Sequence, residues 1–371
     1  MNILVVNWQD RTHPQSGGAE VHFHEIFSRI VRRGHSVTLC CCAHSGAPAE
    51  ETIDGIEILR RGSRALFNFR FPLIWWSTLR ARSFDVVIED LNKVPFFTPL
   101  YVRPPLAGIG HHLFGSTVYL ETGWIAATYV SWMERAALAL YRSRMPFMVV
   151  SPSTREEFIA RGFPPGRLEV IHNCVDHSRY TAAGAVKSPT PLIGCFGRLK
   201  RYKSADHLLR ALPAVRERVP SLEVVIAGEG DDRPRLESIA ATLGLGSAVR
   251  FTGYLTEGDK IKLLRSMWCN VATSSKEGWG LTIVEANACG TPAVASDVPG
   301  LRDAVRDGET GLLYPYGDTE ALANRLILLL EDHALRTRLS TEAVRWAGQF
   351  DWDHAADKTI HFLERVLAGN L

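Results

Sequence analysis

The sequence predicts two α/β domains, each built on a doubly wound parallel sheet. Its 371 residues suit two domains at roughly 100–200 residues each. Short apolar runs alternate with helical patterns in both halves of the chain, which is typical of βαβ units. A stretch rich in Ala, Gly, Ser and Pro at 182–191 separates the two series and is the best candidate for a linker. We therefore expect domains at about 1–180 and 190–350 that face each other across a cleft.

The first series starts with an apolar run at 2–8 and a helix from about Gly18 to Arg33, which Gly34 ends. Further strand-like runs stand at 36–42, 55–61, 85–90, 105–110 and 147–152. The second series has runs at 191–197, 222–228, 249–255, 270–275 and 292–297. Ligands of such sheets bind at the carboxyl ends of the strands, so the loops after these runs are the places to search.

The composition is that of an ordinary globular protein, with 46% hydrophobic residues and a net charge of +2. This balance argues against a protein that coats nucleic acid. The start at Met1 lacks the pattern of a secretory signal, and no apolar run reaches the ~18 residues of a spanning helix, so we expect a cytoplasmic protein. Cys40, Cys41 and Cys42 are better read as small buried hydrophobes than as metal ligands.

The first candidate site is the loop before the first helix, where Gly17 and Gly18 precede Glu20. Paired glycines let a ligand approach the backbone, and a helix N-terminus offers free N–H groups to an anion. The loop lacks the GxGxxG spacing of a dinucleotide-binding fold, which disfavours a nicotinamide dehydrogenase.

The second candidate is a pair of cations at the start of the second domain. Arg198 follows the run 191–197, and Lys203 stands at the start of the next helix, so both can reach one spot above the sheet. Guanidinium and ammonium groups together suit a diphosphate, which they can hold without a metal.

The third candidate is the segment from Glu277 to Glu285, which leaves the run 270–275 and enters a helix. The Gly278-Trp279-Gly280 backbone should expose the amides of Gly280, Leu281 and Thr282 to a phosphate. Glu277 is then left to bind sugar hydroxyls, and Glu285 can accept both hydroxyls of a ribose.

His111 and His112 follow the run 105–110, where a histidine could contact a sugar hydroxyl or position an acceptor. Packing without a direct role is an equally good interpretation of this pair.

Together these segments resemble the retaining glycosyltransferases of family 4, which have the GT-B architecture of two Rossmann-like domains. The motifs are Gly17-Gly18-Ala19-Glu20, the Gly-Arg-Leu-x-x-x-Lys of Gly197 to Lys203, and the E-x7-E element of Glu277 and Glu285. Further segments similar to the family include VIHNCVD at 170–176, and the resemblance covers essentially the whole chain.

The resemblance implies a donor bound mainly by the C-terminal domain and an acceptor bound mainly by the N-terminal one. Arg198 and Lys203 would hold the diphosphate, Glu285 the ribose, Glu277 the transferred sugar, and Leu255 the base. Gly18 would approach the phosphate from the other domain, and His111 fits the family's histidine better than His112. A closing helix at about 353–371 would pack back on the N-terminal domain. Two residues depart from the family pattern, since Cys174 and Ser204 stand where glycine is usual.

The implied reaction moves a hexose-type sugar from a nucleotide diphosphate sugar, with a UDP-sugar favoured, to a hydroxyl acceptor. The acceptor is lipid-linked, a glycan or a small molecule. No side chain stands out as a covalent nucleophile, so we favour front-face displacement with retention and without metal or other cofactor. Arg198, Lys203 and the helix amides would stabilise the leaving phosphate.

A basic, aromatic stretch at 58–84 is the candidate acceptor side. It has six arginines, Trp75, Trp76 and no acidic residue. Arginines mixed with large rings suit contact with an anionic membrane or a lipid carrier, so peripheral association with the inner face of the membrane is one expectation. A packed helix with solvated arginines, or the wall of a pocket for a soluble acceptor, is the other. With Glu20 and His112, these tryptophans complete our acceptor-side candidates.

Two rival functions remain open on the sequence. One is a nucleotide-sugar epimerase of the same fold, and the other is a non-catalytic subunit that binds sugar nucleotides. The cation pair joined to E-x7-E favours transfer.

Overall fold

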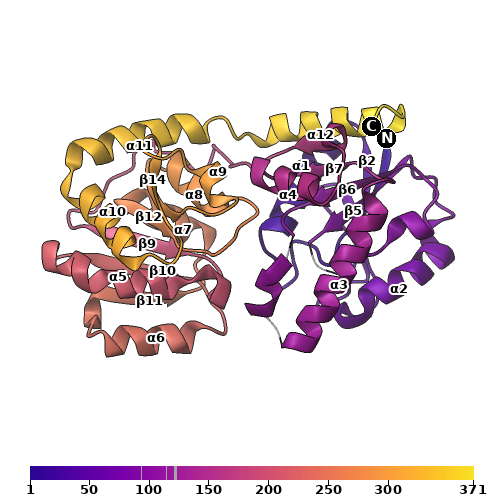
Figure 1. Ribbon diagram of the computed structural model, residues 1–371. Coiled ribbons are helices and arrows are strands. Elements are labelled where there is room, and N and C mark those ends of the chain that lie inside the picture. The colour runs from indigo at the N-terminus through magenta and orange to yellow at the C-terminus, as the bar shows by residue number, and fades with distance from the viewer. Residues whose placement is uncertain (93, 114, 121–122) are drawn as a thin grey trace. The chain divides into compact units, whose positions relative to one another are not determined.

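A computed structural model describes residues 1–92, 94–113, 115–120 and 123–371 (Figure 1). The chain divides into two compact units, of which the first comprises Met1–Asn173 with Trp352–Leu371 and the second Cys174–Asp351. The stretch 182–191, our candidate linker, lies inside the second unit. Each unit holds one largely parallel sheet with helices packed on it, which confirms the predicted fold class.

The first unit has an eight-stranded sheet in the order β3-β4-β2-β1-β5-β6-β7-β8, parallel except for the β3–β4 pair. Its strands are β1 (Asn2–Val6), β2 (Ser36–Cys41), β3 (Glu50–Ile53), β4 (Ile56–Arg60), β5 (Val86–Leu91), β6 (Leu106–Gly110), β7 (Phe147–Val149) and β8 (Leu168–Val170). Its helices are α1 (Gly18–Arg32), α2 (Phe67–Ile74), α3 (Trp124–Tyr141), α4 (Pro152–Ala160) and α12 (Trp352–Leu367). One turn of π-helix, Trp75–Leu79, continues α2.

The second unit has a six-stranded parallel sheet in the order β11-β10-β9-β12-β13-β14. Its strands are β9 (Leu192–Phe196), β10 (Glu223–Ala227), β11 (Val249–Gly253), β12 (Cys269–Ala272), β13 (Ala293–Ser296) and β14 (Gly311–Tyr314). Its helices are α5 (Ala205–Arg218), α6 (Arg233–Thr242), α7 (Glu257–Ser266), α8 (Leu281–Ala288), α9 (Leu301–Ala304), α10 (Thr319–Glu331) and α11 (His333–Ala347).

Each sheet has a switch point, where the strand order reverses. In the first sheet, β2 and β4 extend to one side of β1 while β5 and β6 extend to the other. In the second sheet, β10 and β11 lie to one side of β9 and β12 to the other. Crossovers between parallel strands are right-handed, so the two directions bring helices to both faces. Loops at a switch point diverge and leave a crevice for a ligand.

The central strands are buried on both faces, as the near-continuous apolar runs predict. In β1, Ile3, Leu4, Val5 and Val6 are fully buried. Cys40, Cys41 and Cys42 are buried too, and burial raises the pKa of Cys40 to about 12. Among the described residues, no group of three His, Cys, Asp or Glu side chains has an arrangement suited to a metal ion.

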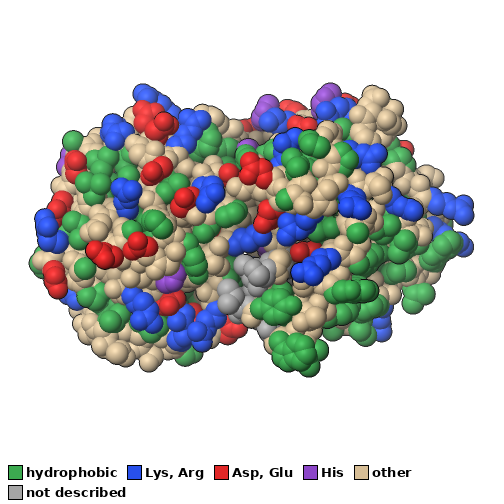
Figure 2. Space-filling model, viewed as in Figure 1, with side chains coloured by type: hydrophobic (Ala, Val, Ile, Leu, Met, Phe, Trp, Pro, Cys, Tyr) green, Lys and Arg blue, Asp and Glu red, His purple; other side chains and the backbone are tan. Residues whose placement is uncertain are grey.

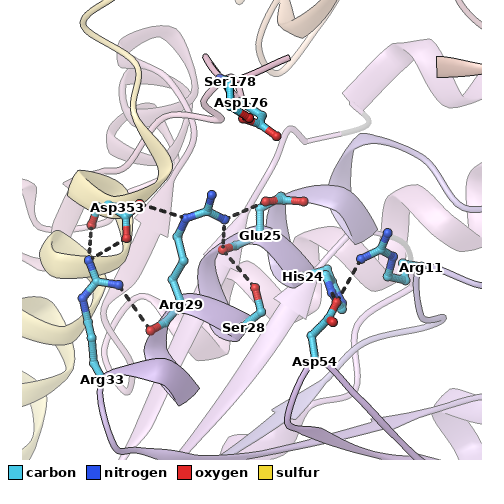
Figure 3. A network of polar contacts seen from close by, with 10 residues as sticks. All are labelled: Arg11, His24, Glu25, Ser28, Arg29, Arg33, Asp54, Asp176, Ser178 and Asp353. Carbon is cyan, nitrogen blue, oxygen red and sulfur yellow. Dashed lines mark hydrogen bonds and ion pairs between the residues drawn. The ribbon is translucent and has the colours of Figure 1, made fainter. Parts of the chain in front are cut away.

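The C-terminal helix α12 packs on α1 within the first unit (Figure 1). Arg33 donates to the Asp353 carboxylate at 3.1 Å, and Arg29 reaches the same carboxylate at 3.4 Å (Figure 3). Arg33 also donates to Asp357 at 2.7 Å. These pairs fix the start of α12 on the basic side of α1. None of the helices in the described ranges is long and apolar enough to cross a membrane.

Candidate functional site

The loop after β9 carries Arg198 and is fixed by the loop after β10. Gly197 N–H donates to the Ala227 carbonyl at 3.0 Å, and Leu199 N–H donates to the Glu229 carbonyl at 2.9 Å. Gly228 allows this approach, because a Cβ on it would lie 1.9 Å from the Gly197 carbonyl oxygen. The Arg198 side chain is left exposed at the carboxyl edge of the sheet.

Lys203 is the last residue of the turn Arg201–Lys203, which follows Arg198. Its ammonium pairs with the Glu277 carboxylate. Burial disfavours the charged form of Lys203, and the like charge of Arg198 does the same. The Glu277 carboxylate outweighs both effects, so the pKa of Lys203 is raised. The two cations therefore act on one region, as the sequence predicts. Their pairing with Glu277 was not foreseen.

The backbone before α8 holds Glu277 in place. Its amide donates to the Pro299 carbonyl at 3.3 Å, and the Ser274 hydroxyl donates to its carboxylate at 2.7 Å. Gly300, with φ at +81°, lets the two loops touch, because a Cβ there would lie 2.3 Å from the Glu277 carbonyl oxygen. Glu277 thus has a cation and a hydroxyl on one carboxylate oxygen.

The segment Gly278-Trp279-Gly280 differs in part from our expectation. Trp279 is buried, with its ring centroid 5.1 Å from that of Phe350. The Leu281 amide, expected to face a phosphate, donates to the Trp279 carbonyl at 2.9 Å. In this arrangement Leu281 offers no free N–H. For the amides of Gly280 and Thr282, contact with phosphate stays a prediction.

Glu285 is buried in α8 and forms a 2.5 Å ion pair with Lys260 of α7. The Lys260 ammonium lies 5.5 Å from the centre of the Tyr180 ring. Burial and the neighbouring Glu285 carboxylate raise the pKa of Tyr180, so its hydroxyl stays protonated. Leu255, half-buried, lies two residues after β11 and close in sequence to Lys260. Sequence reasoning missed Lys260 and Tyr180, although Lys260 lies in the first turn of the helix that follows the FTGYL segment.

These groups gather at the switch point of the second sheet. Arg198 and Lys203 follow β9, Glu277 and Glu285 follow β12, and the two strands are neighbours. Two carboxylates and three cations, with Lys260 included, therefore line one edge of one sheet. Such a set can bind a diphosphate through its cations and sugar hydroxyls through its carboxylates.

In the first unit, Gly17 and Gly18 open α1 after β1. Gly17 is the N-cap, and its amide donates to the Glu20 carboxylate at 2.7 Å. Glu20 is buried, so the structure uses this acceptor-side candidate to cap a helix. Gly18 is exposed with open space where a Cβ would stand, and its approach to a phosphate stays a prediction.

His111 follows β6 at the carboxyl edge of the first sheet, and its Nε2 lies 3.0 Å from Asp90 Oδ1. Asp90 Oδ2 accepts from the Asn7 amide at 3.0 Å, and Asn7 Oδ1 accepts from Asn92 at 2.9 Å. Burial disfavours the charged imidazole, but Asp90 outweighs it and raises the pKa of His111. His112 is half-buried beside it. Sequence reasoning missed Asp90, Asn7 and Asn92, although each is a polar residue at or just past the end of an apolar run.

A second histidine, His22 of α1, contacts His111 edge to face, with ring centroids 5.1 Å apart. Burial and the neighbouring His111 lower the pKa of His22 well below its ordinary value. His22 is therefore neutral while His111 pairs with Asp90.

The structure separates the two tryptophans of the acceptor-side stretch. Trp75 is buried in the aromatic core with Phe67 and Phe71, so the expectation that it presents its ring at the surface is wrong. Trp76 is 47% exposed and lies under Arg80, whose guanidinium carbon is 4.8 Å from the ring centre. Adjacent helical residues point about 100° apart, which explains the difference.

The six arginines of this stretch divide in the same way. Arg60 is buried against Asp10, Arg61 pairs with Glu50, and Arg82 pairs with Glu57. Three remain exposed on the α2 side: Arg64, Arg70 and Arg80.

The fold is that of a two-domain GT-B protein, and the charged edge of its second sheet is suited to anions and hydroxyls. Residues 16–179 match the family described as Glycosyltransferase Family 4, and residues 178–346 match Glycosyl transferases group 1. The chain belongs to the family 4 glycosyltransferases.

Curated relatives agree with this assignment. A D-inositol 3-phosphate glycosyltransferase of Salinispora arenicola is 37% identical over 55% of this chain, and the match spans about half (51%) of that protein. A glycogen synthase of Mycobacterium tuberculosis is 26% identical over 97% of this chain and 93% of its own. A phosphatidyl-myo-inositol mannosyltransferase of Mycobacterium leprae is 37% identical over 44% of this chain and 43% of its own.

Solved structures share the fold along nearly the whole chain. Sucrose-phosphate synthase from Thermosynechococcus elongatus has a TM-score of 0.85 at 21% identity and covers 99% of both chains. HepE from Anabaena in complex with UDP-glucose has a TM-score of 0.77 at 22% identity, covering 98% of this chain and 99% of its own.

Proposed function

We propose that this protein transfers a hexose-type sugar from a nucleotide diphosphate sugar to a hydroxyl acceptor, with retention at the anomeric carbon and without a metal ion. The observation that carries the proposal is the convergence of Arg198, Lys203, Glu277 and Glu285 at one switch point. Family membership favours transfer over the epimerase and over a silent sugar-binding subunit.

The paired state of the site suits this role. A donor diphosphate that meets Arg198 would compete with Glu277 for Lys203, and the freed carboxylate would accept hydroxyls of the transferred sugar. Glu285 would accept the ribose hydroxyls beside Lys260. Charge that develops on the leaving phosphate is then stabilised by cations already in position.

Retention is what the family resemblance implies, and no side chain among the described residues of the site is a committed nucleophile. With donor bound, the Glu277 carboxylate would still accept from the Ser274 hydroxyl and would bind hydroxyls of the transferred sugar, which leaves it a weak nucleophile. We therefore favour front-face displacement, in which the leaving phosphate oxygen takes the acceptor proton. His111, with Nε2 on Asp90, would direct Nδ1 to a sugar hydroxyl.

The identity of the donor is tested by thermal unfolding of the purified protein in the presence of UDP-, GDP- and ADP-sugars. We expect a UDP-sugar to stabilise most, in line with the UDP-glucose complex of HepE. A ligand at 100 times its dissociation constant stabilises by about 2.7 kcal/mol. No shift with any of the three would contradict the proposed function.

The reaction is tested by NMR of the sugar product formed with and without EDTA. We expect an α-linked product from an α-linked donor at the same rate in both samples. Inversion, or loss of activity with EDTA that Mg²⁺ restores, would refute this mechanism. An epimerised donor without transfer would favour the rival enzyme.

For the acceptor, we propose a lipid-linked molecule and peripheral association of the first unit with anionic membranes. The three exposed arginines beside exposed rings support it, and the name of the Mycobacterium leprae relative refers to a phosphatidyl acceptor. Co-sedimentation with phosphatidylglycerol vesicles tests it, with phosphatidylcholine vesicles as the control. Equal recovery in both supernatants would favour a soluble acceptor.

A further inference from the structure

A cavity of about 560 Å³ lies between α2 and α3 of the first unit. Its walls are mainly apolar and include Trp8, Phe69, Val94, Val118 and Tyr129. The Trp8 indole N–H donates to the Val94 carbonyl at 3.0 Å, so this polar group of the wall is already satisfied. A cavity of this size and lining suits an apolar ligand better than a sugar.

The cavity lies at the functional edge of its sheet. Trp8 follows β1 and Val94 follows β5, the two strands at the switch point, and Val118 comes after β6. His111 directly follows β6 at the same edge. An occupant of the cavity would therefore lie on the side of the first sheet that carries His111.

The two helices beside the cavity present apolar faces to solvent. Leu66, Phe69, Leu73 and Trp76 recur at helical spacing along α2 and its flanking turns, and all are exposed. Ile125, Tyr129 and Trp132 do the same on α3, where Trp132 is 67% exposed. Figure 2 shows hydrophobic side chains gathered over the α2 and α3 side of this unit. A continuous exposed apolar surface of this kind marks an interaction site.

Within the described parts of these two segments, the exposed charged side chains are all basic. Arg64 lines the cavity, and Arg70 and Arg80 are exposed on the same segment. Across the described ranges 61–84 and 123–140 the one acidic residue is Glu134, which is buried. Cations beside exposed rings are complementary to a phosphate attached to an apolar chain.

We propose that this cavity binds the hydrocarbon chain of a membrane lipid acceptor whose phosphate Arg64 contacts. The exposed faces of α2 and α3 then rest in the membrane surface, and the lipid's sugar-accepting end reaches the edge at His111. This inference rests on the proposed function, and it adds where the acceptor binds and what chemical class it has. Burial of the hydrocarbon chain between the two helices favours a lipid over a soluble acceptor. The Arg64 guanidinium favours a lipid whose headgroup is anionic.

Calorimetric titration with hexyl, octyl and decyl phosphate, each below its micellar concentration, tests the inference on the unaltered protein. Each added methylene that enters the cavity should tighten binding by about fourfold. Arg64→Gln should weaken decyl phosphate by about tenfold or more but leave decanol unchanged. Binding that is independent of chain length, or as tight for inorganic phosphate, would overturn the proposal in favour of a soluble acceptor.

Filling the cavity gives a second test. Ala65→Trp, from the α2 side, and Val130→Trp, on α3, each place an indole in it and should abolish the chain-length dependence. Ala139→Trp, exposed on α3 and away from the cavity lining, is the matched control and should bind as the unaltered protein does. Full decyl phosphate binding in both filled variants would refute the proposal.

Stabilisation by UDP distinguishes failure of this inference from failure of the proposed function. UDP should stabilise the filled variants as much as the unaltered protein, because its binding groups lie in the second unit. Stabilisation by UDP without chain-length-dependent binding overturns the lipid cavity alone. Absence of any nucleotide effect in the unaltered protein overturns the proposed function, whereas tight decyl phosphate binding would still support the cavity.

Discussion

At the switch point of the second sheet the side chains are charged and paired with one another, whereas at that of the first sheet they are apolar and surround a cavity. In the second unit, Lys203 pairs with Glu277 and Lys260 with Glu285. In the first, Trp8 and Val94 form walls of the cavity, Arg64 lines it, and Asp90 is buried with His111. We expect the same topology to support two kinds of recognition. One edge would bind by charge and hydrogen bonds, and the other mainly by shape and burial, with Arg64 as its charged contact.

Removing a cation from the charged edge should have the largest effect on activity. Lys203→Ala and Arg198→Ala should each lower kcat by about 100-fold or more, the usual cost of losing a group that stabilises charge in the transition state. Steady-state rates with a saturating donor measure the effect, and circular dichroism checks the fold.

The neighbouring cations are matched controls. Lys200 pairs with the exposed Asp231, and Arg201 with Asp232. Lys200→Ala and Arg201→Ala should keep rates within about twofold. Lys200 is in an exposed pair, which contributes little, and the buried Asp232 keeps its two bonds from Arg235 when Arg201 is lost. Equal losses in all four variants would mean that the loop needs only general positive charge.

The first unit's buried pair should respond to pH. Asp90 raises the pKa of His111, so their pairing stabilises the fold fully below the ordinary histidine value of 6.5 and loses this contribution as pH rises through the raised pKa. Asp90→Asn should remove this alkaline decline and lower kcat/KM by about tenfold. Urea unfolding between pH 5 and 9 measures the first effect.

His22 provides a contrast of opposite sign. Its pKa is lowered, so its contribution is lost as pH falls below 6.5, and His22→Phe should remove only the acidic decline. If Asp90→Asn left the alkaline side of the curve unchanged, Asp90 would not control the charge of His111.

A substitution at Glu285 tests whether this residue binds the donor before the reaction begins. Glu285→Gln should raise the donor KM by about tenfold and leave kcat nearly unchanged, because contact with a ribose is the same before and during transfer. Glu257→Gln on the neighbouring helix, which breaks an exposed pair with Arg179, should alter neither value. A fall in kcat without a change in KM would place Glu285 at the reacting sugar.

The sequence predicts the charged edge better than the apolar one, for a physical reason. Arg198, Lys203, Glu277 and Glu285 stand in short segments whose spacing reflects one loop and one helix each. The cavity draws on residues that follow four different strands, and no local spacing records that they meet.

The same reason accounts for the errors. Trp75 and Trp76 are alike in sequence, and the packing of α2 on the sheet decides which is buried. Strands β3, β8 and β14 were not predicted; each lies at an edge of its sheet and pairs with a single neighbouring strand. The long apolar runs were predicted as strands because burial on both faces leaves a strong pattern.

The smallest effect concerns the backbone that carries Lys203. Ser204 has φ at +49°, a left-handed conformation that costs a side chain about 1 kcal/mol relative to glycine. Its hydroxyl offsets this cost through contact with the Tyr316 hydroxyl at 2.9 Å. Ser204→Gly should therefore change the free energy of unfolding by less than about 1 kcal/mol, since strain and hydrogen bond are lost together. Ser204→Ala keeps the strain without the bond and should destabilise by about 1 kcal/mol, measured by urea unfolding. An alanine variant as stable as the unaltered protein would mean that the hydroxyl does not hold this turn, and that α5 alone positions Lys203 at the charged edge.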